Sequence, residues 1–94
     1  MKLAIVVGQV VATVKCHSLV GDPLLLIQFL DGDGVPGEAL SVATDPIGAG
    51  NGEWVLVVEG SSARLASKTA GATDLSIVGI VDEVTVKGSS LFHK

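Results

Sequence analysis

Short runs of aliphatic residues, many of them β-branched, recur along the whole chain and are separated by glycines and prolines. Such alternation is typical of an all-β protein, because branched side chains fit a pleated strand while glycine and proline favour turns. Between these runs, Gly21-Asp22-Pro23 and residues 31–34 have turn composition. Five predicted strands follow, at residues 3–14, 24–30, 39–44, 53–58 and 74–81.

One short helix is expected before the fifth strand. Ser61 can cap it, residues 62–68 can form it, and Gly71 lies where a left-handed stop is commonly needed. Residues 83–94 are predicted to add an extra strand or a hairpin arm. Five strands with a helix before the last are typical of a small closed barrel of the OB type, with the helix closing one end. The sequence therefore predicts an all-β fold, a small five-stranded OB-like β-barrel with one short helix and a C-terminal β arm.

The first predicted strand is apolar on both faces, with Leu3 and Ile5 on one side and Ala4 and Val6 on the other. The second and fifth strands repeat this pattern. A barrel strand in a monomer buries one face and exposes the other to water, so a second apolar face favours burial against another copy of the chain.

Small residues strengthen the expectation of self-association. Ala4, Gly8 and Ala12 are spaced by four residues and are predicted to lie on one face, where a neighbouring backbone could approach closely.

Chain length and composition limit the possibilities further. With 94 residues the chain forms one domain, residues 1–94, and a domain of this size buries only about 60–65% of its unfolded surface. Disulfides, metals or association usually stabilise such domains. The single cysteine, Cys16, excludes an internal disulfide, and no cluster of metal ligands is visible. Association remains, and it agrees with a composition of 48% hydrophobic and 17% charged residues.

The charge balance argues against two classes of partner. A net charge of −4 disfavours nucleic acid, whose phosphates require Lys and Arg. No apolar run approaches the roughly 18–20 residues needed to span a bilayer, so no membrane partner is expected. We expect a cytoplasmic protein with its thiol reduced.

Candidate catalytic patterns fail on spacing. The glycines of residues 48–52 do not match G-x-G-x-x-G and precede a strand rather than a helix. Asp31 and Asp33 lack the remaining ligands of a calcium loop. Cys16 and His17 are adjacent, so in an extended segment they point to opposite faces. We therefore predict no catalytic residue, no cofactor and no metal: the chain is expected not to be an enzyme.

Two single residues carry open alternatives. Arg64 is the only arginine, and it is either a plain surface residue or an interface residue whose guanidinium holds a carboxylate or carbonyls of a neighbouring subunit. Trp54, the only tryptophan, is interpreted as a core or interface anchor.

Several blocks of the chain together form a recognisable pattern, of which the most specific is DPIGAGNGEWVLV at residues 45–57. The other blocks are residues 1–4, 8–13, 24–28, 59–64 and 77–82, together with Asp74. In this order the blocks resemble the EutN/CcmL family of bacterial microcompartment vertex proteins. Residues 52–54, 81–84 and 91–94 are most similar to the ethanolamine-utilisation branch, and residues 28–31 to the carboxysome branch. At Cys16 the family usually has a charged or polar residue.

The resemblance implies a structural shell protein without catalytic residues. It implies an OB-like barrel that assembles into a pentamer, occupies the vertices of a polyhedral shell in the bacterial cytoplasm, and meets hexagonal shell proteins. Within that arrangement we expect two segments near the subunit contacts or the ring axis, because small residues permit close backbone approach. These are Gly48, Ala49 and Gly50, and Ser61, Ser62, Ala63 and Arg64.

Two other functions are alternatives. An OB barrel can bind single-stranded nucleic acid, but the acidic charge and the three aromatic residues Phe29, Trp54 and Phe92 disfavour it. A ring-forming co-chaperonin is also a small β-barrel, but it requires a long mobile loop, and the loops expected here are short and glycine-rich.

Overall fold

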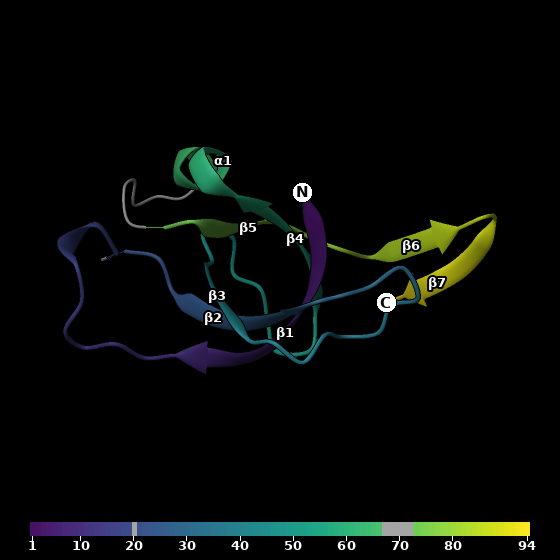
Figure 1. The fold of residues 1–94 in the computed structure, drawn as a ribbon, viewed down its shortest axis with the longest axis horizontal. Coiled ribbons are helices and arrows are strands. Elements are labelled where there is room, and N and C mark those ends of the chain that lie inside the picture. The colour runs from purple at the N-terminus through teal and green to yellow at the C-terminus, as the bar shows by residue number, and fades with distance from the viewer. Residues whose placement is uncertain (20, 67–72) are drawn as a thin grey trace.

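A computed structural model of the chain describes residues 1–19, 21–66 and 73–94. The first five strands close into a barrel in the order β1-β2-β3-β5-β4, and the last two form a separate hairpin. In Figure 1 this hairpin, called the arm below, extends away from the barrel, which gives the molecule dimensions of 44 × 22 × 20 Å. The elements are β1 (Lys2–Val10), a short 3-10 helix (His17–Leu19), β2 (Leu24–Phe29), β3 (Ser41–Thr44), β4 (Trp54–Glu59), α1 (Gly60–Ala66), β5 (Leu75–Ile80), β6 (Glu83–Val86) and β7 (Ser89–His93). The predicted small barrel with one short helix and a C-terminal β arm is confirmed.

The core consists of alternate side chains that point into the barrel. All are aliphatic and almost completely buried, and α1 adds Ala63, which is also fully buried. Burial of these groups is the main favourable contribution to folding, because removal of apolar surface from water contributes about 25 cal/mol per Å². The cluster comprises Ala4, Val6, Leu25, Ile27, Ala43, Val55, Val57 and Ile77.

The barrel closes between β3 and β5, which run parallel to each other. Among the described residues, Thr44↔Ser76 is the one residue pair that joins them. Hydroxyl groups reinforce this junction: Thr44 Oγ1 lies 3.2 Å from Thr73 Oγ1, and Thr73 Oγ1 donates to the Leu75 carbonyl at 2.8 Å. Burial of these hydroxyls is tolerable because they are hydrogen-bonded.

A β-bulge in β1 overturns one sequence prediction. Pairing with β2 shifts between Val6 and Gly8, so the side-chain alternation reverses at this point. A Cβ placed on Gly8 would contact the Leu26 side chain at 3.4 Å, and Leu26 lies on the outer face between the buried Leu25 and Ile27. Ala4, in contrast, points into the core. The prediction that Ala4, Gly8 and Ala12 share one face is therefore wrong.

Element boundaries differ from the predictions at several ends. β1 ends at Val10 rather than at residue 14, because its last partner is Leu24 and Pro23, which precedes Leu24, has no N–H to continue the ladder. Val11 and Val14 are consequently 83% and 95% exposed. β3 begins at residue 41, and the fourth and fifth strands are shifted by one residue at some ends.

The predicted helix start is also wrong. α1 begins at Gly60, whose φ of 63° would be strained for other residues, so Ser61 lies inside the helix instead of capping it. The predicted stop at Gly71 and the helical residues 67–68 lie outside the described residues.

Candidate assembly surfaces

The glycine loop between β3 and β4 is shaped by Asp45. This carboxylate is buried and accepts hydrogen bonds from the backbone N–H groups of Ile47 (3.2 Å), Gly48 (3.0 Å) and Ala49 (2.7 Å). Such Asx turns replace the hydrogen bonds that a strand would otherwise provide. Ala49 then packs against the core, whereas Gly48 and Gly50 remain exposed. This role of Asp45 was not predicted from the sequence, although Asp-Pro before a glycine is a recognisable turn signal.

The second predicted segment lies on α1. Ser61, Ser62 and Arg64 are exposed, whereas Ala63 is buried in its own subunit. The glycine loop precedes the first residue of β4, and α1 follows its last residue, so the two segments lie at opposite ends of this strand (Figure 1). The structure therefore does not bring the two predicted segments together within one chain.

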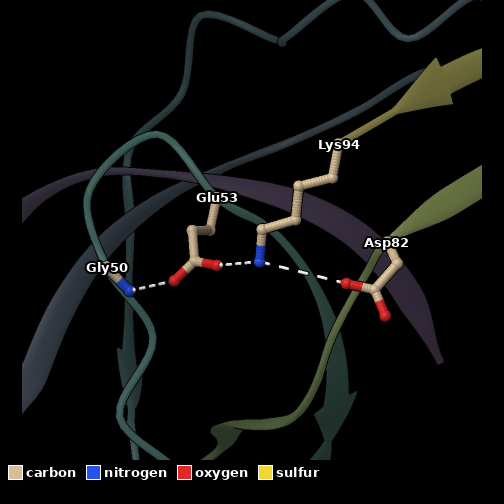
Figure 2. A network of polar contacts seen from close by, with 4 residues as sticks. All are labelled: Gly50, Glu53, Asp82 and Lys94. Atoms are coloured by element: carbon tan, nitrogen blue, oxygen red, sulfur yellow. Dashed lines mark hydrogen bonds and ion pairs between the residues drawn. The ribbon is translucent and has the colours of Figure 1, made fainter.

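A polar network joins the glycine loop to the base of the arm (Figure 2). The Gly50 N–H donates to Glu53 Oε1 at 2.7 Å, and Lys94 Nζ lies 2.7 Å from Glu53 Oε2 and 3.9 Å from Asp82 Oδ1. The backbone N–H of Lys94 also donates to the Asp82 carbonyl at 2.9 Å. Glu53 thus holds both the loop and the end of the arm.

These contacts shift the pKa values of two side chains, Glu53 and Lys94. The hydrogen bond from Lys94, followed by that from the Gly50 N–H, holds the pKa of Glu53 below its ordinary value of 4.5. The same bond to Glu53 raises the pKa of Lys94 above its ordinary value of 10.5. A carboxylate with a lowered pKa stabilises the folded state fully above pH 4.5, and this stabilisation is lost as the pH falls through the folded-state pKa.

Replacing Glu53 by glutamine should remove this acid-sensitive attachment of the arm. The amide oxygen can still accept from Gly50, but the ion pair with Lys94 is lost. Fluorescence of Trp54, the only tryptophan, reports on the arm during an acid titration, because the Trp54 ring stacks on Phe92 of β7. We expect a transition below pH 4.5 in the native chain that Glu53→Gln lacks. Glu59→Gln, which breaks a different exposed pair, with Lys2, should keep it. An unchanged transition in Glu53→Gln would contradict the assignment.

An apolar contact holds the same end of the arm. The rings of Trp54 and Phe92 stack with centroids 4.2 Å apart and an interplanar angle of 11°. Gly34 packs closely against the Trp54 ring and the Leu91 side chain. A Cβ at Gly34 would lie 2.8 Å from Trp54 Cη2 and 3.5 Å from Leu91 Cγ. Trp54 is half-buried and lies outside the core cluster, where it joins barrel, turn and arm within its own chain. Its predicted role as an interface anchor stays a prediction.

Reactive groups are sparse on these surfaces. Within the described ranges 1–19, 21–66 and 73–94, no three His, Cys, Asp or Glu side chains are grouped so that they could hold a metal ion. In the same ranges, no helix has the length and apolar character needed to cross a bilayer. Cys16 is exposed.

Fold and surfaces together define a small closed barrel with a helix at one end and a projecting hairpin, a class that solved structures share. An ethanolamine utilization protein, EutN, superposes with a TM-score of 0.91 at 53% identity, covering 100% of this chain and 99% of that chain. The pentameric microcompartment shell protein GrpN from Rhodospirillum rubrum superposes with a TM-score of 0.82 at 43% identity, covering 92% and 98%.

Sequence comparison gives the family. The profile described as ethanolamine utilisation protein EutN/carboxysome matches residues 1–82. The shell vertex protein EutN of Escherichia coli K12 is 53% identical over the full length of both chains. The carboxysome shell vertex protein CcmL of a Synechocystis species is 48% identical, covering 100% of this chain and 95% of its own. The chain belongs to the EutN/CcmL family of microcompartment shell vertex proteins.

Proposed function

We propose that this chain is a structural subunit of a bacterial microcompartment shell and forms a pentamer that caps the vertices of the polyhedral shell. The observation that carries the proposal is full-length similarity to proteins named as shell vertex proteins, together with a pentameric shell protein of the same fold. Their names place such proteins in a shell, and we propose the same location here, in the bacterial cytoplasm next to hexagonal shell proteins.

Physical chemistry supports an assembled form. The outer barrel face retains apolar side chains, including Leu3, Ile5 and Leu56, that are only partly covered by their own chain. A subunit that forms a closed ring needs two different complementary surfaces, because each copy contacts the next through a head-to-tail interface. Burial of the apolar face in such a ring supplies the stability that a domain of this size lacks alone.

We further propose that the two predicted segments form contacts or line the axis of the ring. One comprises Gly48, Ala49 and Gly50, and the other comprises the exposed α1 residues Ser61, Ser62 and Arg64. Ala63, in the same segment, is fully buried in its own subunit and holds α1 in place. Their positions at opposite ends of β4 are compatible with two distinct surfaces. We propose no catalytic role for these residues, because the relatives of the chain are named as shell vertex proteins.

Native mass spectrometry tests the proposed function. A species of roughly 47 kDa, five times the chain mass of 9.5 kDa, is the expected result. Arg64→Ala and Gly50→Leu should both shift the distribution to smaller species, whereas Lys15→Ala, a control at an exposed site, should not. A monomeric native chain would overturn the proposal. A pentamer that persists in both variants would remove these two segments from the interface.

A further inference from the structure

A groove of about 690 Å³ lies between the outer face of the barrel and the first strand of the arm. Its lining is largely aliphatic and comes from strands that are distant in the sequence, with Leu3 on β1, Leu56 on β4, Ile80 on β5 and Val84 on β6. All four side chains are only partly buried. Two exposed acidic residues, Asp82 and Glu83, also line the groove, and Lys94 Nζ lies 3.9 Å from Asp82 Oδ1.

The arm keeps this groove open. Lys94 pairs with Glu53, and Phe92 stacks on Trp54, so the arm is held to the barrel by residues other than the aliphatic ones that line the groove. A surface held in this way needs little rearrangement when a partner binds, which favours affinity.

A complementary surface is present on α1. Leu65 is 88% exposed, and Arg64, the only arginine of the chain, lies beside it and is also exposed. An aliphatic side chain next to a guanidinium matches an aliphatic groove with a carboxylate, since the apolar parts exclude water while the charges set the register. In a chain of net charge −4, such a pair also offsets repulsion between copies.

α1 cannot occupy the groove of its own chain. α1 directly follows the last residue of β4 and is held to the barrel end by the buried Ala63, while the arm projects in another direction (Figure 1). The match of aliphatic and charged groups described above favours α1 of another copy as the occupant. A groove on one copy and a helix on the next form a head-to-tail contact, the type that closes into a ring.

We infer that the groove receives α1 of a second copy, with Leu65 packed against Leu3, Leu56 and Val84 and with Arg64 paired to Glu83. This inference rests on the proposed function, because it assigns the two surfaces of the proposed ring. It also gives Arg64 one of the two roles that sequence analysis left open, that of holding a carboxylate of a neighbouring subunit.

Charge reversal tests the ion pair in the full chain. Arg64→Glu and Glu83→Arg should each weaken assembly at low salt by at least about tenfold, as measured by sedimentation of a dilution series. The double variant restores opposite charges between copies and should recover most of the loss. Lys87→Glu, which makes the same charge change as Arg64→Glu elsewhere on the exposed surface, serves as the control.

Leu65→Ser tests the apolar contact, with Val14→Ser as its control because Val14 is 95% exposed. We expect smaller species for Leu65→Ser only. In a Cys16→Ser background, Leu65→Cys combined with Val84→Cys should form disulfides between copies on oxidation, whereas either cysteine alone should form far fewer.

The outcomes separate the inference from the proposed function. A pentameric native chain whose Leu65→Ser variant behaves as Val14→Ser, or whose charge-reversed double variant gains nothing over the singles, overturns the inference and leaves the proposed function intact. A native chain that stays monomeric overturns the proposed function itself. Far-ultraviolet circular dichroism of each variant confirms that exposed substitutions leave the barrel folded.

Discussion

Replacing Ile27 by alanine is expected to lower the free energy of unfolding by about 2–5 kcal/mol, since a buried aliphatic side chain is lost and a cavity remains. Ile27 has 0% exposure and belongs to the core cluster. Small domains are stable by only about 5–15 kcal/mol, so the change removes a large part of the total. Urea unfolding at one fixed protein concentration measures it, because association adds to apparent stability.

Ile47→Ala is the matched control, the same substitution at a side chain that is 46% exposed. Its cost should be clearly smaller, because less apolar surface returns to water. Equal losses for Ile27 and Ile47 would contradict the assignment of the barrel interior as the core.

Gly34→Ala is the second large effect, and it should detach the arm. Gly34 has a φ of 78°, which is strained for alanine, and its Cβ would lie 2.8 Å from Trp54 Cη2. The ring cannot move aside freely because it stacks on Phe92. We expect a loss of about 1–3 kcal/mol from backbone strain and displaced packing together, with a change in Trp54 fluorescence.

Gly52→Ala separates the two causes of that loss. Gly52 has a φ of 86°, but a Cβ there would meet nothing within 4 Å. Gly52→Ala should therefore show only the strain, about 1 kcal/mol, without the fluorescence change. The Trp54 contact would be excluded as a cause if both variants had identical stability and emission.

Much of the fold could be predicted because local signals and global pairing agree. Aliphatic runs predicted the five barrel strands, and Asp31 with its glycines predicted a turn. In that turn the Asp31 carboxylate accepts hydrogen bonds from the backbone N–H groups of Asp33 and Val35. The bulge at Val6–Gly8 could not be seen, because it depends on pairing with β2 rather than on the composition of β1. The predicted common face of Ala4, Gly8 and Ala12 failed for that reason.

The candidate assembly surfaces could be predicted only where they depend on local sequence. Glycine content and a lone arginine indicated the loop and α1 directly, and their roles in assembly stay predictions. The attachment of the arm could not be predicted, since Glu53 and Lys94 are 41 residues apart and no spacing rule links them. Leu65 was not singled out because exposure of a single leucine is decided by which face of α1 meets the barrel.

The junction of β3 and β5 is the place where we expect local opening of the barrel in solution. Among the described residues this strand pair is joined through one residue pair, Thr44 and Ser76, whereas every other pair of neighbouring barrel strands shares four or more. Regions with few stabilising contacts open first in the native state. Transient opening here would uncover two strand edges, the surfaces through which β-proteins exchange strands or aggregate. Enclosure within a ring would then protect the subunit as much as build the shell.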